Sequence, residues 1–531
     1  MLDNQQWIAP EYYNLTSEME QHPPDKIALI WLNELGNKEE ITYGELRKQA
    51  NQLAGGLADL GLRQGDPVLV MVPRRIIAYI IYLACLKLGL AIIPSSEMLR
   101  AKDLSYRLRH SEARAVIAWS EVAHEVDKIT EDMPALDYRL SVSGNESTIS
   151  SNWLNLEHLM IDQPDTFTAV NTRSDDIAIL AYTSGTTGNP KAVVHSHGWG
   201  YAHLRITSSL WLDIRDSDTV WATAAPGWQK WIWSPFLAVL GNGATGFVYN
   251  GPFQPNRYLQ LMQEHGIQVL CCTPTEYRLM AKTEKLNQYD LSSLRCAVSA
   301  GEPLNQEVIQ TFQREFDITI RDGYGQTEST LIIGTLKDTP IRLGSMGKSI
   351  APGIVEVIDE DGHPLPPGVV GDIAVHLSMA ALFKSYYKDP ERKKNSSHGN
   401  YFVTGDRARK DEDGYFWFEG RGDDIIISSG YTIGPFEVED ALMKHPSVKE
   451  CAVVASPDSI RGHIVKAFVV LKDDSTASPE LVKELQSHVK EWTAPYKYPR
   501  KIEFIQNLPK TSSGKIRRIE LREQEKQAAQ Q

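Results

Sequence analysis

A run of nine residues, TSGTTGNPK from Thr183 to Lys191, has the side chains best suited to chemistry on phosphate. Glycine permits backbone conformations in which successive amides point at an anion. Hydroxyl groups add hydrogen-bond donors, and the final lysine adds positive charge. The residues expected to contribute are Thr183, Ser184, Gly185, Thr186, Thr187, Gly188 and Lys191. We therefore expect this loop to bind the phosphates of a nucleotide.

Two other interpretations of the loop agree less well with the sequence. The spacing GxxxxGK[ST] of a Walker A loop is absent, and no helix is expected to start at the lysine. A flexible Ser/Thr/Gly loop at the surface has the same composition. However, the run follows the apolar segment IAILAY and precedes AVVHSH, both of which are typical of buried strands. This position between two strands favours the phosphate-binding interpretation.

Five further motifs follow in order along the chain: AGEPL (300–304), DGYGQTE (322–328), YFVTGD (401–406), GRGDD (420–424) and PKTSSGK (509–515). Together with the phosphate loop they resemble the signatures of the adenylate-forming superfamily of acyl-CoA synthetases, adenylation domains and luciferases. Three C-terminal segments are similar in sequence to the medium-chain acyl-CoA synthetase branch: SSGYTIGPFEVEDALMKHPSV, APYKYPRKIEF and LPKTSSGKIRR. The resemblance covers essentially the whole chain.

The resemblance implies that the substrates are ATP, coenzyme A and a carboxylic acid, with Mg²⁺ as the metal. Glu328 resembles the carboxylate that binds magnesium in the family. A carboxylate is a suitable ligand for a hard cation that bridges phosphates. Lys515 is expected to supply the charge that adenylation needs as pyrophosphate leaves, so Lys515, Thr327 and Glu328 are the expected catalytic residues. No protein nucleophile is required, and the Ser/His residues at 195–197 are not expected to form a hydrolase triad.

The expected nucleotide site gathers residues from all six motifs. Tyr324 offers a flat surface for adenine, and Asp406 with Arg421 is expected to hold the ribose hydroxyls. The ATP/AMP residues beyond the phosphate loop are Gly301, Glu302, Pro303, Asp322, Gly323, Tyr324, Gly325, Gln326, Thr327, Asp406, Arg421, Thr432 and Lys515.

A second set matches the coenzyme A positions of the branch: Ser429, Gly430, Tyr431, Arg461, Lys490, Tyr498, Pro499 and Arg500. Gly430 is expected to line a narrow pantetheine channel, and the cations suit the nucleotide phosphates. The sequence departs from the branch twice. Thr432 stands where arginine is usual, and Met98 stands where a polar coenzyme A contact occurs, so neither contact is assured.

The acid is expected near Trp228, Asp322 and Gly325. Trp221, Trp228, Trp231 and Trp233 crowd into thirteen residues that are uncharged apart from Lys230. For each tryptophan except Trp228, hydrophobic core and acyl pocket are equal alternatives. The segment favours a saturated, short-to-medium monocarboxylic acid, straight or branched, with benzoate-like acids as the runner-up.

The elements that must position these residues are helices alternating with strands. Leu46, Leu53, Leu57 and Leu60 recur at helical spacing before the strand PVLVMVP. We therefore expect an α/β fold: a large N-terminal domain with helix-covered sheets (residues 1–422) and a small mobile α+β C-terminal domain (residues 424–531). A hinge at Asp423 is expected to give the two arrangements that two half-reactions require.

Composition limits the remaining function classes. The net charge of −13 over 531 residues argues against a nucleic-acid partner. The apolar stretch Ile76–Ile93 is interrupted by Lys87 and Gly89, so a buried helix that runs into a strand is expected rather than a membrane span. The five cysteines show no ligand spacing and are expected to be reduced, mostly buried thiols, with Cys271 and Cys272 in the core of a strand. The opening MLDNQQWIAPEYYN lacks the pattern of a signal peptide. A cytoplasmic enzyme without a prosthetic group is expected, and its oligomeric state is left open.

Two competing functions share most of these motifs. A stand-alone adenylation enzyme that loads a carrier protein would not need the coenzyme A set. A catalytically dead homologue that only binds nucleotide would not need the full set of Lys191, Glu328, Asp406, Arg421 and Lys515. The presence of both sets favours an acyl-CoA synthetase.

Overall fold

The computed structural model describes residues 5–142, 152–183, 190–302, 304–422, 424, 426–428, 431–458, 462–472, 475–493, 495–510 and 515–528. The chain divides into two compact units. Unit 1 comprises residues 1–301, 311–338 and 377–395, and unit 2 comprises residues 302–310, 339–376 and 396–531. The mixed α/β class expected from the sequence is confirmed.

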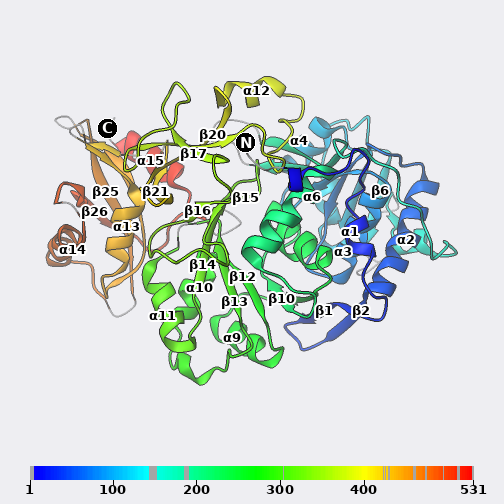
Figure 1. The fold of residues 1–531 in the computed structure, drawn as a ribbon, viewed down its shortest axis with the longest axis horizontal. Helices are drawn as coiled ribbons and strands as arrows, with labels where there is room; N and C mark the ends of the chain where they lie inside the picture. The colour runs from blue at the N-terminus through cyan, green and yellow to red at the C-terminus, as the bar shows by residue number, and fades with distance from the viewer. Residues whose placement is uncertain are drawn as a thin grey trace. The chain divides into compact units, whose positions relative to one another are not determined.

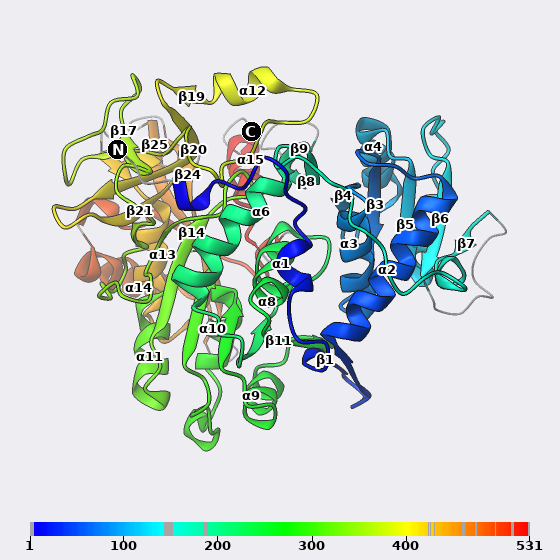
Figure 2. The ribbon, with the colours of Figure 1, turned by 45° about the vertical axis from the view of Figure 1, so that its right-hand side comes forward.

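Unit 1, whose first 301 residues run from blue to green in Figure 1, contains a sheet with the strand order β7-β6-β5-β3-β4-β8-β9. This sheet is parallel except for the β8/β9 pair, and its strands are labelled in Figure 2. Its strands are β3 (Pro67–Met71), β4 (Ala91–Pro94), β5 (Ala115–Trp119), β6 (Tyr138–Val142), β7 (Leu154–Asn155), β8 (Ile177–Thr183) and β9 (Lys191–Ser196). Their continuous apolar runs are typical of strands that are covered on both faces.

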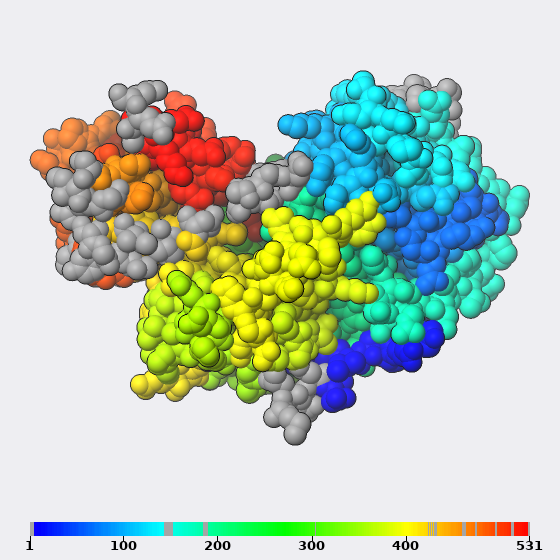
Figure 3. Space-filling view, turned by 90° about the horizontal axis from the view of Figure 1, so that it is seen from above, coloured from blue at the N-terminus to red at the C-terminus, as the bar shows by residue number. Residues whose placement is uncertain are grey.

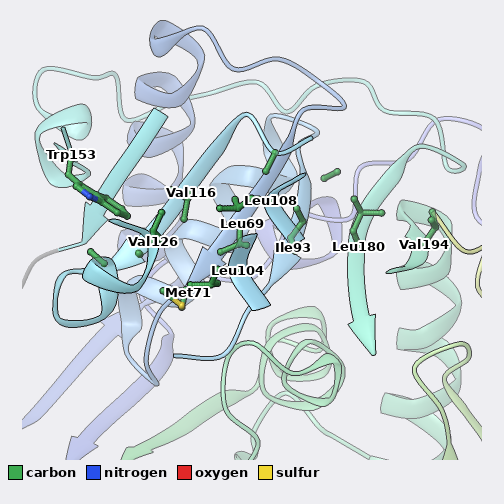
Figure 4. Packing of buried hydrophobic residues seen from close by; sticks show 14 residues of the cluster. Leu69, Met71, Ile93, Leu104, Leu108, Val116, Val126, Trp153, Leu180 and Val194 are labelled. Carbon is green, nitrogen blue, oxygen red and sulfur yellow. The ribbon is translucent and has the colours of Figure 1, made fainter. Parts of the chain in front are cut away.

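Three helices connect consecutive parallel strands of this sheet: α3 (Ile76–Lys87), α4 (Ala101–Ser111) and α5 (Ser120–Asp127). A fourth helix, α2 (Tyr43–Leu60), precedes β3. In Figure 2, α2 and α3 lie beside one another along the sheet. Figure 4 shows the core between strands and helices, where Leu69 and Val116 meet Leu104 and Leu108 of α4.

Other strands of unit 1 follow one another in the order β15-β14-β13-β12-β10-β11-β1-β2. Pairing is parallel from β14 to β1 and antiparallel at β15 and β2. The strands are β1 (Ile27–Asn33), β2 (Lys38–Thr42), β10 (Thr219–Ala222), β11 (Thr245–Asn250), β12 (Val269–Cys272), β13 (Cys296–Ala300), β14 (Ile320–Gly325) and β15 (Leu331–Gly334).

The remaining helices of unit 1 include two π-helical stretches, η4 and η5, a form that is often found near functional sites. The helical elements are η1 (Gln5–Trp7), α1 (Ser17–Glu20), η3 (Glu157–Met160), α6 (His197–His203), η4 (Leu204–Leu212), α7 (Gln229–Trp231), η5 (Ile232–Ala238), α8 (Val239–Gly241), α9 (Pro255–Glu264), α10 (Pro274–Ala281), η6 (Leu286–Gln288) and α12 (Pro390–Asn395). Helix α11 (Gln306–Phe316) has residues in both units.

The first described residues run along the surface of unit 1 (dark blue in Figure 3). The amide of Tyr13 donates to the carbonyl of Thr172 at 2.9 Å, and Tyr12 bridges to Arg173. This segment is therefore held by backbone pairing with residues that are far away in sequence.

Unit 2 is largely antiparallel. One of its sheets has the order β17-β18-β20-β21-β16, with β19 beside β20, and another has the order β24-β25-β26. The strands are β16 (Gly347–Ser349), β17 (Val355–Ile358), β18 (Val370–His376), β19 (Ser397–His398), β20 (Tyr401–Lys410), β21 (Tyr415–Arg421), β22 (Ile426–Ser428), β23 (Tyr431–Ile433), β24 (Val448–Asp458), β25 (Gly462–Leu471) and β26 (Lys501–Phe504). The helices are α13 (Pro435–Met443), α14 (Pro479–Trp492) and α15 (Arg518–Ala528).

Several local expectations can be checked against these elements. The stretch 76–93 forms the buried helix α3 and the strand β4. No helix within the described ranges is long and apolar enough to cross a membrane. Cys271 and Cys272 lie in the buried strand β12, and all five cysteines are buried thiols.

The expected domain boundary is not decided by the division into units. The hinge expected at Asp423 lies outside the described residues. Unit 2 contains the expected small domain and also the strands from β16 to β21, which precede it in the chain. The hinge therefore stays a prediction.

Candidate functional site

The phosphate loop is closed at its base by two paired strands. β8 ends at Thr183 and β9 begins at Lys191, and these two residues are direct antiparallel partners. Lys191 is half-buried and starts a strand, not a helix, as the absence of a Walker A pattern predicted. The five residues of the loop that were expected to surround the phosphates, Ser184, Gly185, Thr186, Thr187 and Gly188, lie outside the described residues.

The residues after β14 lie close to Lys191 through a shared neighbour, Tyr386. The Tyr386 hydroxyl donates to Glu328 Oε1 at 2.9 Å, and Lys191 Nζ lies 5.1 Å from the centroid of the Tyr386 ring. The structure thus gathers the expected magnesium carboxylate and the phosphate-loop lysine around one tyrosine. The sequence did not point to Tyr386, because the segment SYYKDP carries no phosphate- or metal-binding pattern.

Thr327 is supported from β9 by a histidine. His195 Nε2 donates to the Thr327 carbonyl at 2.7 Å, and burial lowers the pKa of His195 to about 3. The nearby Nδ1 of His197 accepts a hydrogen bond from the Leu15 amide. Both imidazoles therefore serve as neutral supports of the backbone, consistent with the expectation that they do not form a hydrolase triad.

Two glycines of the DGYGQTE motif are required by close packing. A Cβ at Gly323 would lie 2.5 Å from the Trp211 ring, and one at Gly325 would lie 2.2 Å from the Thr330 carbonyl oxygen. The half-buried Tyr324 stands between them on β14. Gly325 pairs with Leu331 of β15, and its expected place beside the acid stays a prediction.

Asp322 has the most perturbed carboxyl group of this motif. Its Oδ1 accepts from the Gly323 amide at 2.9 Å, and the Trp211 indole donates to its carbonyl. Burial raises the pKa of Asp322 from 3.8 to about 8. The side chain is therefore mostly protonated at neutral pH, which suits a neighbour of a negatively charged substrate.

Gly301 follows the strand β13 and has a φ of +108°, which favours glycine. Glu302, which comes next, is half-buried and belongs to unit 2. Pro303 lies outside the described residues. Gln326 is half-buried at the turn between β14 and β15, and its backbone N–H donates to Ser329 Oγ at 3.1 Å.

Asp406 and Arg421 are brought together in unit 2. They are direct partners on the antiparallel strands β20 and β21, and Arg421 Nε lies 3.9 Å from Asp406 Oδ1. Asp406 is 6% exposed, and its amide donates to Thr404 Oγ1. The arrangement provides a buried carboxylate beside an exposed guanidinium, as a clamp for vicinal hydroxyls requires.

Three residues of the expected coenzyme A set form one cluster in unit 2. Lys490 Nζ lies 4.1 Å from the Tyr498 ring centroid, and the Arg500 guanidinium carbon lies 4.8 Å from it. Arg500 Nη1 also donates to the Tyr498 hydroxyl at 2.7 Å. The backbone carbonyl of the buried Pro499 accepts a hydrogen bond from the Gln486 side chain. Two cations around one aromatic ring form a suitable anion site.

Lys515 stands at the base of a hairpin. Lys510 and Ile516 form a β-bridge, and the Arg517 amide donates to the Pro509 carbonyl at 2.8 Å. Lys515 itself is exposed. The hairpin is therefore closed by backbone pairing, which leaves this lysine at the surface of unit 2.

The four tryptophans of this segment differ in burial. Trp221, Trp231 and Trp233 are 2%, 1% and 6% exposed, and Trp231 stacks on Phe236 with ring centroids 5.4 Å apart. Trp228 is half-buried and precedes α7. Its neighbour Gly227 has a φ of +93°, and a Cβ there would lie 2.4 Å from the Ser96 amide.

Several expected residues lie outside the described part of the chain: Asp423, Ser429, Gly430 and Arg461. Tyr431 and Thr432 belong to β23, but their side chains are not described. Met98, one of the two departures from the branch, is 50% exposed.

Comparison with known protein families gives two matches. Residues 15–387 match the family described as AMP-binding enzyme, and residues 437–515 match the AMP-binding enzyme C-terminal domain. Among curated proteins, the chain is 60% identical over 529 residues to an uncharacterized acyl-CoA ligase of Bacillus subtilis (strain 168), with 99% of both chains covered. It is 41% identical over 532 residues to the mitochondrial acyl-coenzyme A synthetase ACSM3 of Homo sapiens, with 97% and 90% covered.

Solved structures with a similar fold include two aryl-CoA ligases. An anthranilate CoA ligase in complex with anthranoyl-AMP superposes with a TM-score of 0.90 at 30% identity, with 98% of this chain and 99% of that chain covered. A benzoate CoA ligase from Burkholderia xenovorans LB400 superposes with a TM-score of 0.82 at 27% identity, with 96% and 100% covered.

Proposed function

Because this chain belongs to the family of AMP-binding enzymes, we propose that it is an AMP-forming acyl-CoA synthetase. It converts a carboxylic acid, ATP and coenzyme A into acyl-CoA, AMP and pyrophosphate. The acid oxygen attacks the α-phosphate in the first half-reaction, and the bond to pyrophosphate breaks. The coenzyme A sulfur attacks the acyl carbon in the second, and AMP leaves.

The observation that carries this proposal is the cluster of Lys490 and Arg500 around Tyr498. An enzyme that only forms adenylates has no need of a second anion site on unit 2. Two cations at one tyrosine suit the nucleotide phosphates of coenzyme A. Lys490 is exposed and Arg500 is half-buried, so the site is open to a large ligand.

In the first half-reaction the protein supplies charge and position. Lys191 and the loop before it bind phosphate, and Lys515 neutralises charge as pyrophosphate leaves. Asp406 with Arg421 holds the ribose, and Tyr324 stacks on adenine. These residues neither form nor break a covalent bond themselves, which is consistent with a reaction that requires no protein nucleophile.

Mg²⁺ fits the residues that surround Glu328. A carboxylate has about four lone-pair sites, so it can accept the Tyr386 hydroxyl and still bind a cation. Mg²⁺ is commonly held by one or two carboxylates together with substrate phosphates. When bound, the ion neutralises charge on the phosphates. The protein's part is to hold Glu328 in one orientation.

The acyl group is a saturated, short-to-medium monocarboxylic acid, straight or branched, and it lies beside Trp228. We assign the carboxyl group of the acid to the region of Asp322 and Gly325. Benzoate-like acids are the second candidate, which the similarity to the anthranilate and benzoate CoA ligases supports. Trp228 is the tryptophan that we assign to the acid, because it is half-buried whereas Trp221, Trp231 and Trp233 are buried.

Pyrophosphate release tests the function when it is measured over linear, branched, aromatic and dicarboxylic acids, each with and without coenzyme A. Each methylene that fits an apolar pocket adds roughly 0.8 kcal/mol, so kcat/KM should peak at one chain length. Acyl-CoA should form only when coenzyme A is present. A flat profile, or a preference for dicarboxylic acids, would contradict the acyl assignment.

A matched pair of variants separates the synthetase from a carrier-loading enzyme. Arg500→Ala should raise the KM for coenzyme A while adenylate formation stays unchanged, because Arg500 belongs to the coenzyme A set and not to the adenylation residues. Arg257→Ala, at an exposed ion pair with Glu264, serves as the control for loss of a surface cation. Equal loss of both half-reactions in Arg500→Ala would refute the coenzyme A assignment.

A further inference from the structure

A short segment of unit 1, residues 383–389, ties β9 to the turn that carries Glu328, and we call it the strap. It leads into α12, which is labelled in Figure 1. The strap lies beside β9 through hydrogen bonds from Lys384 to Val194, from Val194 to Ser385 and from Tyr387 to Ala192, at 2.8 to 2.9 Å. At its start, the Phe383 amide donates to the Glu328 carbonyl at 2.8 Å.

Tyr386 is the residue of the strap whose side chain contacts both functional groups. It is 4% exposed, and its backbone bridges to Val193, two residues after Lys191. Its hydroxyl lies 2.9 Å from Glu328 Oε1, and its ring lies 5.1 Å from Lys191 Nζ. Three segments that are far apart in sequence therefore converge at one buried side chain.

The electrostatics of this contact has a clear direction. The Tyr386 hydroxyl is the donor of the hydrogen bond at 2.9 Å, and the Glu328 carboxylate oxygen accepts it. A hydrogen bond to a charged group is stronger than one between neutral groups. The negative face of the ring attracts the Lys191 ammonium at the same time.

We propose that Tyr386 is a positioning residue for adenylation: its hydroxyl holds the Glu328 carboxylate, and its ring holds the Lys191 ammonium, so that both face the same phosphates. This inference rests on the proposed function, because it takes Glu328 as the magnesium carboxylate. Residues that orient a metal ligand affect metal affinity without touching the ion.

A purely structural role for Tyr386 makes a different prediction. Its ring also packs against Phe383, with centroids 4.8 Å apart, and Arg392 lies over it at 5.7 Å. If these contacts were the only purpose of the side chain, its loss would lower the melting temperature without any change in the response to Mg²⁺. The two roles can therefore be separated by a binding measurement.

The test is ATP binding by isothermal titration calorimetry on the full chain, at a series of Mg²⁺ concentrations and without any acid. Tyr386→Phe keeps the ring and removes the hydroxyl. The Mg²⁺ concentration that gives half of the maximal enhancement should rise about 10- to 100-fold. ATP binding in the presence of a chelator should stay unchanged, because the ring still faces Lys191. Tyr386→Leu should weaken that binding as well.

Tyr387→Phe is the matched control, because Tyr387 follows directly in the strap and packs near His110 and Lys388 instead. It should leave the Mg²⁺ response as in the wild type. An unchanged Mg²⁺ response in Tyr386→Phe, with or without a lower melting temperature, overturns the inference and leaves the proposed function standing. If the wild type shows no Mg²⁺-dependent ATP binding, the proposed function fails and the inference fails with it.

Discussion

Among single residues, Lys515 is the one whose charge the first half-reaction needs most directly. Lys515→Ala should slow adenylate formation by about two decades or more, since loss of a cation that acts on the transition state costs on the order of 3 kcal/mol. Thioester formation from a supplied acyl adenylate should stay nearly unchanged. Each half-reaction is measured separately by rapid quench.

Lys510→Ala provides the matched control for this change. Lys510 belongs to the same hairpin, but it pairs with Glu450 at 2.7 Å. Both half-reactions should proceed normally in this variant. Equal slowing of both halves by Lys515→Ala would mean that the lysine is structural or shared.

Asp322 predicts a pH dependence of stability with a defined sign. Its pKa is raised to about 8 by burial, so the folded state binds a proton that the unfolded state releases above pH 4. The stability that this group contributes is present below pH 4 and is lost as pH rises through 8. Asp322→Asn, which cannot ionise, should therefore gain stability relative to the wild type as pH increases from 4 to 8. Thermal melts across this range measure the difference.

Asp359 serves as the control with the opposite sign. Hydrogen bonds from the backbone, first that of His363, lower the pKa of this exposed carboxyl group. Its contribution to stability is present above pH 4 and is lost as pH falls. Asp359→Asn should therefore be less stable than the wild type at neutral pH, and the difference should vanish in acid. Parallel pH profiles for the two variants would contradict the assignment for Asp322.

At the scale of elements, α15 is held against unit 2 by buried ion pairs. Arg518 donates to both carboxylate oxygens of Glu439, which also accepts from the Val453 amide at 2.8 Å. Lys466 pairs with Glu525, and Arg522 pairs with Asp424. Helix α15 begins three residues after Lys515, so these pairs anchor the C-terminal end of the hairpin that carries the lysine.

Glu439→Gln should therefore destabilise unit 2. Removing one partner of a buried pair leaves an uncompensated charge and costs about 3 to 5 kcal/mol. Glu450→Gln, at the more exposed pair with Lys510, should cost less than about 1 kcal/mol. Urea unfolding followed by circular dichroism compares the two variants. Similar midpoints would show that the Glu439 pair is not a structural anchor.

For the whole molecule, two half-reactions at one site require two arrangements of the domains. We expect the hinge at Asp423. Asp423→Pro should slow thioester formation and leave adenylation nearly intact, because a fixed φ hinders the second arrangement. Asp423→Ala removes the same carboxylate without fixing φ, so it should be much closer to the wild type. Adenylation that slows as much as thioester formation would place the hinge elsewhere.

The sequence by itself determined the family, the order of the motifs and the α/β class. Local patterns were sufficient because the spacing of apolar residues is the signal that forms a helix or strand, as in α2 and β3. The two strands that flank the phosphate loop were also expected from their apolar residues, and the structure adds that Thr183 pairs directly with Lys191. The six motifs carried the chemistry because each keeps its functional residues within a few positions of one another.

Only the tertiary structure decided which distant residues meet. The sequence left the core and pocket alternatives equal for Trp221, Trp231 and Trp233, and the assembled fold buries all three side chains, with Trp231 stacked on Phe236. Tyr386 reaches Glu328 and Lys191 only because the strap runs beside β9, and no local pattern encodes that pairing. The raised pKa of Asp322 likewise arises from burial, which depends on the assembled fold and not on neighbours in sequence.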